Sequence, residues 1–250
     1  VVRYRYAPAS LEVLVNDGGI VGNLRRRPWT LLLVPGFVLG QLLALRRLLR
    51  AGTDVVHAHW IIPQAFTAAL LGLAGTRLPP MLVTSHGADL FALRGGLLSA
   101  LKRFALRRCQ AATVVSTAML EPIIALGMPA DRVQVAPMGV DMSGRFTPDP
   151  AVTRSRSELL FVGRLVEKKG LAVLIDALPR VLARHPDVSL TIAGFGPELE
   201  ARQAQVRALG LDAHVRFLGA VQQDALPALY RRAAMLVAPF VQARSGDREG

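Results

Sequence analysis

Residues 161–170, FVGRLVEKKG, join an apolar run to a helix-like run through a short basic turn. Gly163 allows the chain to leave a strand sharply, and Arg164 and Lys169 flank the turn. A guanidinium and an ammonium group beside the free N–H groups of a helix start favour an anion, above all a diphosphate. The turn has no Gly-Lys-Ser or Gly-Lys-Thr, so it is not a Walker loop. This stretch predicts a strand–turn–helix unit with a diphosphate site, and a merely solvated basic loop is the plain alternative.

Short apolar runs alternate with helix-length segments from this turn to the end of the chain. Strands are expected at 158–162, 188–193, 214–218 and 235–238, and helices at about 170–184, 198–208 and 224–232. This alternation is typical of βαβ units around a parallel sheet that helices cover on both faces.

The same alternation fills the amino-terminal part of the chain. Strands are expected at 54–58, 81–85, 112–116 and 132–136, and helices at about 37–50, 64–74, 96–108 and 117–126. The alternating run at residues 2–6 is predicted to be part of a further strand.

Between the two series lies a segment, 142–157, with two prolines, several Ser and Thr residues and scarcely any apolar periodicity. Such a composition is typical of an interdomain linker. We therefore predict an α/β protein with an amino-terminal Rossmann-like domain at 1–145, a linker at 146–157 and a carboxyl-terminal Rossmann-like domain at 158–250. Ligands of open α/β sheets lie beyond the carboxyl ends of the strands, so the two domains are expected to face a cleft.

A Gly-x-Gly pattern, formed by Gly194 and Gly196, follows the strand expected at 188–193. Leu199 stands where a dinucleotide-binding fingerprint has its third glycine, so the full fingerprint fails. We favour a tight strand-to-helix turn, whose backbone N–H groups line the same cleft.

Histidines lie at the ends of two strands expected in the amino-terminal part of the chain. His86 follows the strand at 81–85, where ligands are met, although a lone histidine is often structural. His57 and His59 lie two apart and so share a side of their strand. They have no third ligand at a recognisable spacing, so no metal site is predicted. No signature of a nucleophile with its base occurs either.

The composition excludes several classes of protein. The chain has 250 residues, 30 Lys plus Arg, 18 Asp plus Glu and 52% hydrophobic residues, which excludes a disordered polyelectrolyte. Cys109, the single cysteine, can form no internal disulfide, which favours a reducing, cytoplasmic location. Aromatic residues are only 6% and no nucleic-acid-binding motif accompanies the basic residues, so nucleic acid is not an expected partner.

Two stretches, 29–45 and 55–76, carry no charged residue. Because both contain proline and polar residues, we expect buried elements of a soluble domain rather than membrane-spanning helices. The segments 42–50 and 97–108 combine Leu with Arg in a helical pattern. Such helices either present a solvated basic face or contact an anionic lipid surface, and we take peripheral membrane contact as a hypothesis.

The order of short motifs along nearly the whole chain resembles that of family 4 retaining glycosyltransferases, which have the GT-B fold. The motifs are HAHW at 57–60, SHGADL at 85–90, PMGVD at 137–141, VGRLVEKKG at 162–170, AGFGPE at 193–198, VRFLGAV at 215–221, MLVAPF at 235–240 and the final Glu-Gly.

This resemblance implies roles for individual residues. Arg164 and Lys169, with Gly163 at the turn, match the pair that binds the donor diphosphate. His86 matches the histidine near the transferred sugar, and Glu249 matches the first glutamate of the Glu-x7-Glu motif, which contacts the donor sugar.

The resemblance also implies a nucleotide-binding region beside Arg164 and Lys169. Phe217, Leu218 and Gly219 match the backbone that cradles the nucleotide base, and Gly194 and Gly196 are assigned to the same nucleotide-binding region.

The sequence departs from the family pattern at three places. The second glutamate of the motif would follow residue 250, and the amino-terminal Gly-rich loop is absent. Met138 stands where Asn often precedes Gly-Val-Asp. We expect a fragment in which both domains are incomplete and which is inactive alone.

The expected activity is transfer of a sugar from a nucleoside-diphosphate sugar to an acceptor hydroxyl of an envelope polysaccharide or lipid-linked glycan. The resemblance implies retention of anomeric configuration. Fixed cations and a helix dipole stabilise the leaving diphosphate, so no cofactor and no metal is expected. The expected location is cytoplasmic, with possible peripheral contact with an anionic membrane. The alternatives are a non-catalytic nucleotide-sugar-binding module, a GT-B sugar epimerase and a membrane-embedded protein.

Overall fold

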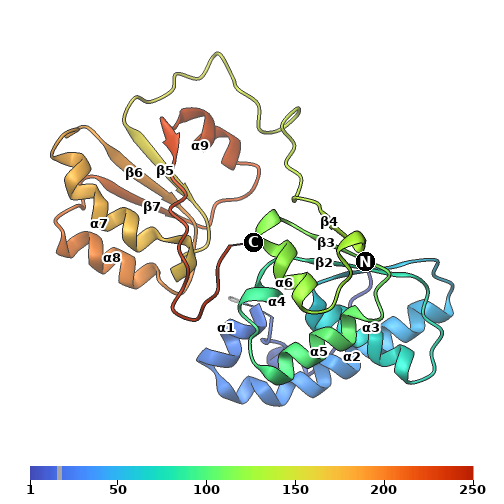
Figure 1. Cartoon of the computed structure of the whole chain (residues 1–250). Coiled ribbons are helices and arrows are strands. Elements are labelled where there is room, and N and C mark those ends of the chain that lie inside the picture. Colours follow the sequence, from blue (N-terminus) through green and yellow to red (C-terminus); the bar gives the residue numbers. More distant parts are fainter. Residues whose placement is uncertain (16–18, 250) are drawn as a thin grey trace. The chain divides into compact units, whose positions relative to one another are not determined.

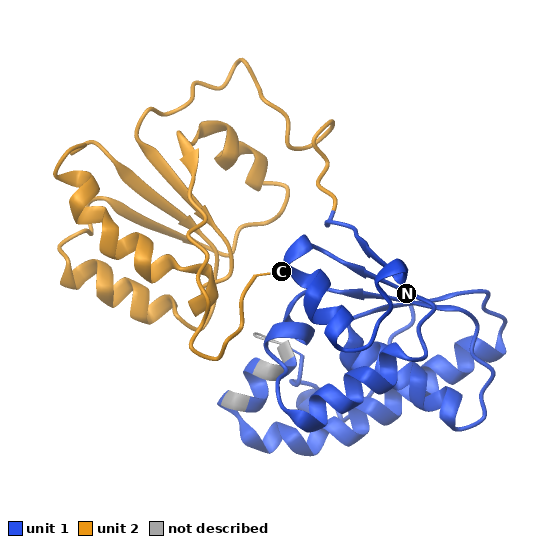
Figure 2. Ribbon diagram, in the orientation of Figure 1, with its two compact units in different colours: residues 1–138, 250 blue, residues 139–249 orange. Residues whose placement is uncertain are grey.

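The computed structural model describes residues 1–15 and 19–249. The chain divides into two compact units, Val1–Met138 and Gly139–Glu249 (Figure 2). Each unit has its own parallel sheet and its own apolar core, so the predicted α/β class with two βαβ assemblies is confirmed.

The sheet of the first unit has four parallel strands in the order β1-β2-β3-β4. They are β1 (Val56–His59), β2 (Met81–Ser85), β3 (Ala111–Val114) and β4 (Val133–Val135). Val83 and Val114 are fully buried and Ala112 nearly so, as expected of strands covered on both faces. Their carboxyl ends meet at one edge of the sheet, which collects the loops that follow them.

Helices surround this sheet (Figure 1). They are α1 (Gly19–Arg26), α2 (Val34–Arg50), α3 (Phe66–Leu73), α4 (Ala88–Phe91), α5 (Gly96–Leu106) and α6 (Leu120–Ala125), with short helical turns η1 (Ala9–Leu11), η2 (Pro28–Leu33), η3 (Ile61–Ala65), η4 (Thr117–Met119) and η5 (Ala130–Arg132). The strand–helix alternation predicted from residue 37 onward is therefore observed.

The strand predicted at residues 2–6 is wrong, because this segment is irregular. Both of its tyrosines pack against α2: the ring centres of Tyr4 and Tyr6 lie 5.7 and 5.4 Å from that of Phe37. Gly40 leaves room for Tyr4, since a Cβ there would lie 2.7 Å from the tyrosine ring. An alternating pattern here reflects helix packing rather than strand pairing.

The two uncharged stretches have different surroundings. Residues 55–76 form β1, η3 and α3, and Ala65, Ala68 and Ala69 of this stretch are buried, as expected. Residues 29–45 were expected to be buried, and this is confirmed for Thr30 and Phe37 but wrong for the leucines on the outer side. Leu32 is 82% exposed and Leu43 is 60% exposed. Among the described residues, one helical stretch, Pro28–Arg50, has the length and apolar composition that a membrane-crossing helix needs.

The sheet of the second unit also has four parallel strands, in the order β7-β6-β5-β8. They are β5 (Glu158–Val162), β6 (Ser189–Ala193), β7 (Val215–Gly219) and the short β8 (Met235–Leu236), joined by η6 (Glu167–Lys169), α7 (Leu171–Leu182), α8 (Leu199–Ala208) and α9 (Leu226–Arg232). Helices α7 and α8 lie side by side on one face, and α9 lies on the other (Figure 1). The chain runs outward from β5 to β7 and returns to the other side of β5 at β8. The carboxyl ends of β5 and β8 are therefore a topological switch point, where open α/β sheets bind ligands.

The segment at 146–157 is irregular and contacts its own unit. The guanidinium of Arg231 in α9 donates a 2.7 Å hydrogen bond to the carbonyl oxygen of Thr147. Arg145 forms an ion pair with Asp224, and the ring of Phe146 meets that of Tyr230 edge-on at 5.7 Å. Residues 145–147 are thus held on α9 and its preceding loop.

Candidate functional site

The turn after β5 is built by hydrogen bonds to the neighbouring turn after β6. The N–H of Gly163 donates to the carbonyl of Ala193 at 3.0 Å, and that of Leu165 donates to Phe195 at 2.9 Å. The side chain of Leu165 is fully buried, which anchors the turn, and Arg164 beside it is half-buried. The turn is therefore a fixed part of the sheet edge.

The side chain of Lys169 runs along this turn toward Gly163. A Cβ built on Gly163 would lie 3.7 Å from Cδ of Lys169, so the lysine stem passes the glycine. Its Nζ lies 4.6 Å from the centre of the Phe240 ring, within cation–π range. Gly163, Arg164 and Lys169, predicted from the sequence to act together, thus belong to one turn at the switch point.

Glu249 joins this group from the far end of the chain. Its carboxylate lies 3.0 Å from Nζ of Lys169 and 3.3 Å from Nζ of Lys168, which also pairs with Asp247. Burial raises the pKa of Glu249, but the hydrogen bond from Lys169 and the charge of Lys168 outweigh this effect and leave its pKa lowered. The carboxylate is therefore negatively charged at neutral pH, where it faces the two lysine ammonium groups.

The start of α7 faces the same turn. Gly170, the N-cap, has φ +70° and a backbone so close to Pro239 that a Cβ would lie 1.9 Å from the proline carbonyl oxygen. Within the described residues no side chain caps α7, so its first N–H groups and the positive end of its dipole remain available to an anion.

The glycines after β6 serve close packing. A Cβ on Gly194 would lie 1.8 Å from the carbonyl oxygen of Gly163, and one on Gly196 would lie 2.4 Å from that of Leu165. The N–H of Gly194 donates to the carbonyl of Gly219 at 2.8 Å. These contacts match the tight-turn interpretation, and the Gly194 amide is already engaged.

The end of β7 completes this edge of the second sheet. Gly219 has φ +70° and pairs with Ala193 after a one-residue shift in register. Phe217 packs against the core beneath α7 and α8, and Leu218 is half-buried. The backbone of 217–219, rather than the Phe217 ring, is therefore what β7 presents at this edge.

Histidines gather at the corresponding edge of the first sheet. Nδ1 of His59 lies 2.9 Å from Nε2 of His86, and the two rings stack with centres 5.2 Å apart. The ring of His57 lies 4.4 Å from that of His59, and its Nε2 is 2.7 Å from Oγ1 of Thr84. Trp60, with φ +84°, lies 5.8 Å from His86. His86 is therefore one member of a three-histidine stack.

Asp89 fixes the two loops that carry these histidines. Its carboxylate is fully buried and accepts hydrogen bonds from the N–H of Ile61, at 2.8 Å, and the hydroxyl of Ser85, at 2.7 Å. Lys102 is buried nearby and donates to the carbonyl of Leu93 at 2.6 Å. Burial lowers the pKa of Lys102, and the charge of Asp89 offsets part of that effect.

Two histidines of the stack, His57 and His86, have lowered pKa values, which favours their neutral form. Burial, and then the charge of His59, lower the pKa of His86. The pKa of His57 is lowered by burial and by both other histidines. At neutral pH His86 can therefore donate from one ring nitrogen and accept at the other.

Neither a metal cluster nor a reactive thiol is found in the described part of the chain. No group of three or more His, Cys, Asp or Glu residues there could hold a metal ion. Cys109 is buried, which raises its pKa to about 12 and keeps it protonated.

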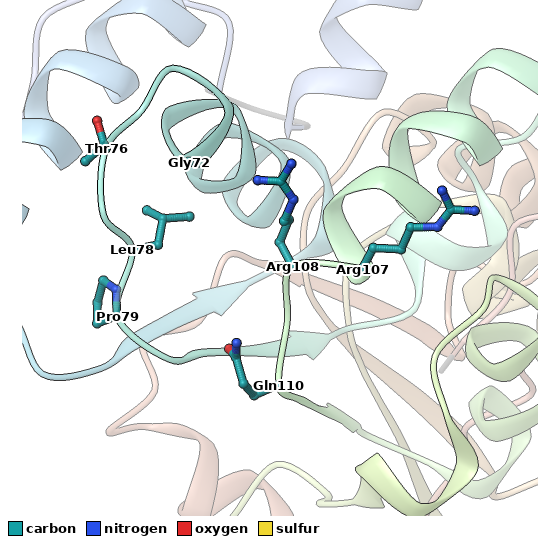
Figure 3. A pocket seen from close by; sticks show the side chains of 7 residues that line it. All are labelled: Gly72, Thr76, Leu78, Pro79, Arg107, Arg108 and Gln110. Atoms are coloured by element: carbon teal, nitrogen blue, oxygen red, sulfur yellow. The ribbon is translucent and has the colours of Figure 1, made fainter.

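Two cavities lie away from these strand ends. One, of about 300 Å³, is lined by Gly72, Thr76, Leu78, Pro79, Arg107, Arg108 and Gln110 (Figure 3). Arg108 points toward Gly72, whereas Arg107 points away from it (Figure 3). Gln110 precedes β3, so this cavity lies at the amino ends of the strands. The other, of about 620 Å³, includes Glu158 and Ser189, the first residues of β5 and β6. By the strand-end rule, neither is the candidate site.

Sequence reasoning missed the role of His59. It paired His59 with His57 only as a metal-site candidate, although β1 and β2 were both predicted. The register pairs His59 with Thr84, two residues before His86, and this brings the two side chains together. The Lys168 contact with Glu249 had no local signal, because 81 positions separate these residues.

Solved structures share this architecture. The Anabaena protein HepE, in complex with UDP and glucose, superposes with a TM-score of 0.65 at 19% identity over 81% of this chain and 55% of HepE. Sucrose-phosphate synthase from Thermosynechococcus elongatus gives 0.65 at 19% identity over 86% of this chain and 56% of the synthase. The two parallel α/β units therefore have the GT-B fold.

Sequence comparisons give the family. Residues 2–143 match the family described as Glycosyltransferase Family 4, and residues 149–243 match Glycosyl transferases group 1. The chain belongs to glycosyltransferase family 4.

Curated relatives are similar over most of this chain. The GDP-mannose-dependent alpha-(1-6)-phosphatidylinositol monomannoside mannosyltransferase of Mycolicibacterium smegmatis is 31% identical over 90% of this chain and 60% of its own length. The phosphatidyl-myo-inositol mannosyltransferase of Mycobacterium tuberculosis is 34% identical over 74% and 48%. The chain thus spans about half the length of these relatives.

Proposed function

We propose that the protein transfers a sugar from a nucleoside-diphosphate sugar to a hydroxyl of a lipid-linked or envelope glycan, with retention of anomeric configuration. The observation that carries this proposal is the position of Lys169, which lies along the Gly163 turn where α7 begins. The name of the Mycolicibacterium smegmatis enzyme supports GDP-mannose as the donor, and both names support a phosphatidylinositol-type lipid as the acceptor.

Departure of a diphosphate requires positive charge where the glycosidic bond breaks. Lys169, Arg164 and the N-terminus of α7 supply that charge from fixed positions, so the negative charge on the leaving oxygen is stabilised as it forms. We propose that the acceptor hydroxyl attacks from the face that the diphosphate leaves, and that its proton passes to the departing phosphate oxygen. Neutral His86 is proposed to hydrogen-bond the transferred sugar.

Because these groups already supply the charge, we propose that transfer needs no divalent metal. Addition of EDTA is expected to leave the transfer rate of the full-length enzyme within about twofold, against a loss of orders of magnitude for a metal-assisted reaction. A rate that collapses with EDTA and returns with Mg²⁺ or Mn²⁺ would contradict this part of the proposal.

Glu249 is proposed to contact the donor sugar once the diphosphate has engaged Lys169. In the structure the carboxylate is the partner of that lysine, at 3.0 Å. Donor binding would thus exchange a carboxylate for a phosphate at the same ammonium group, leaving Lys168 to hold Glu249 in place.

Calorimetric titration with GDP and GDP-mannose tests the diphosphate assignment. Lys169→Ala should weaken binding of both roughly 10- to 100-fold, the worth of one charge-assisted hydrogen bond. Lys168→Ala is the matched control, since it also removes a contact with Glu249 but lies outside the proposed phosphate site. Equal binding by the wild type and the Lys169 variant would refute the assignment.

Product analysis separates transfer from the alternatives. Full-length enzyme given GDP-mannose and a phosphatidylinositol acceptor should release GDP and form a mannosyl lipid in equal amounts. Binding without GDP release would indicate a non-catalytic module, and a changed sugar without transfer would indicate an epimerase. We further propose a cytoplasmic location with an anionic membrane surface as a partner.

A further inference from the structure

The outer face of α2 is apolar where a soluble helix is usually polar. The helix runs along the lower edge of the first unit in Figure 1. Leu39 and Leu43 are 56% and 60% exposed, and Leu32 before them is 82% exposed. Together with exposed Pro35 they recur at helical spacing and form one stripe, here called the α2 stripe.

The inner face of α2 is already occupied by its own unit. Phe37 is buried against Tyr4 and Tyr6, and Gln41 accepts a hydrogen bond from the hydroxyl of Thr67 in α3 at 3.3 Å. These contacts hold α2 as a surface helix. The Pro28–Arg50 stretch is long enough to span a membrane, but a crossing would break these contacts.

Arginines continue the stripe. Arg46, Arg47 and Arg50 are exposed at the end of α2. From residue 19 to residue 53 the sequence has arginines at 25–27, 46, 47 and 50 and no acidic residue. An apolar stripe that ends in unopposed cations matches a surface with acyl chains beneath anionic headgroups.

A second copy of the chain fits this face poorly. Pairing α2 with α2 would place arginines on leucines or on other arginines, and no acidic residue between 19 and 53 could balance them. The other basic helix predicted from the sequence, α5, is also less suited. Its Lys102 is turned inward and is 3% exposed, and Arg108 lies over the ring of Phe104 at 5.3 Å.

We propose that α2 docks the protein on an anionic phospholipid bilayer. The stripe enters the headgroup–acyl boundary by about 5–10 Å, and the arginines reach up to the phosphates. Docking goes beyond glycosyl transfer, because it uses none of the donor-site residues. It identifies the surface by which this enzyme would meet an acceptor that stays in the membrane.

Sedimentation with vesicles tests this proposal in the whole chain. Vesicles of phosphatidylcholine with phosphatidylglycerol should bind the wild type, and vesicles of phosphatidylcholine alone should bind it far more weakly. Leu39→Gln with Leu43→Gln should lower the partition coefficient roughly tenfold or more. Arg46→Gln, Arg47→Gln and Arg50→Gln together should lower it about 100-fold, about fivefold per arginine, and only on anionic vesicles.

Control variants match the change in composition at exposed sites of the other unit. Val173→Gln with Leu209→Gln replaces exposed apolar residues, and Arg180→Gln, Arg184→Gln and Arg207→Gln removes three exposed cations. Both sets should sediment like the wild type. All substituted side chains are exposed, so circular dichroism should show unchanged melting.

Three outcomes would overturn the proposal. The α2 variants and the control variants could lose binding equally, which would indicate a diffuse charge effect. The α2 variants could change the oligomeric state without vesicles, which would indicate a second copy. Resistance of the bound protein to an alkaline carbonate wash would indicate a spanning helix.

A blue shift of Trp29 fluorescence on anionic vesicles, lost in Trp29→Phe, would support insertion of this segment.

Discussion

At the scale of single residues, the proposed function rests on side chains whose charge is set by their neighbours. Glu249 is held ionised by Lys168 and Lys169, and His86 is held neutral by burial and by His59. A donor diphosphate would compete with Glu249 for Lys169, and the sugar would meet an uncharged imidazole. The lysine charge thus suits the proposed diphosphate, and the neutral imidazole suits the proposed sugar.

The contact between His59 and His86 makes a prediction about titration. In His59→Gln the like charge that opposes protonation of His86 is removed, so the pKa of His86 should rise. The fraction of protonated His86 between about pH 5 and pH 7 should therefore increase. NMR titration of the imidazole carbon-bound protons measures this directly. A pKa that stays constant or falls would show that burial alone sets it.

Gly194 makes a prediction about stability. A methyl group there would lie 1.8 Å from the carbonyl oxygen of Gly163, so the two turns would have to separate. Gly194→Ala should lower the free energy of unfolding by about 1–3 kcal/mol. In Gly139→Ala the methyl group would meet no atom within 4 Å among the described residues, so this control should be close to neutral. Urea denaturation compares them, and equal midpoints would contradict the packing role.

At the scale of elements, strand ends bring distant loops together. In the first unit Asp89 of α4 holds the N–H of Ile61, at the start of η3, and so fixes the loop after β1 to the loop after β2. In the second unit the backbone bonds of Gly163, Gly194 and Gly219 join the ends of β5, β6 and β7. The candidate site residues thus derive their positions from sheet register.

Asp89→Asn tests this bracing role. An amide offers one acceptor where the carboxylate serves two donors, and it removes the charge that faces buried Lys102. We expect a loss of about 1–3 kcal/mol in the free energy of unfolding. Asp131→Asn, at an exposed position in η5, should change it by less than about 0.5 kcal/mol. Chemical denaturation measures the free energy of unfolding of both variants. An Asp89 variant as stable as the Asp131 control would contradict the bracing role of Asp89.

The sequence predicted elements well where the strands are fully buried. Residues 158–162 form a strand with the predicted bounds, because a short, mostly apolar run between turns has few alternatives. The prediction failed at residues 2–6, where alternating tyrosines pack on a helix. It also failed for Leu32, Leu39 and Leu43, since apolar composition does not reveal whether a face has a partner.

Contacts between strands were the hardest to predict. His59 and His86 were both noted in the sequence, but their contact depends on the register of β1 against β2. The ion pair between Lys169 and Glu249 depends on how the segment after β8 returns across Gly170. Local patterns give the chemistry of a residue, and only the sheet gives its neighbours.

At the scale of the whole molecule, the chain is two α/β units of a family 4 glycosyltransferase, each with a site-bearing edge. The second unit presents a basic turn and a helix start at its switch point. The first presents a histidine stack at the strand ends and an apolar, arginine-tipped helix at its surface. This distribution supports our proposal that one unit holds the donor and the other approaches a membrane-bound acceptor.

The central claim is that Lys169 and the start of α7 hold the donor diphosphate. A crystal structure with GDP bound tests it most directly. We expect a phosphate oxygen within about 3 Å of Nζ of Lys169, with further oxygens at the first N–H groups of α7 and at Arg164. Glu249 should have left Lys169 while staying beside Lys168. A diphosphate bound elsewhere, with the Lys169–Glu249 pair intact, would contradict the account.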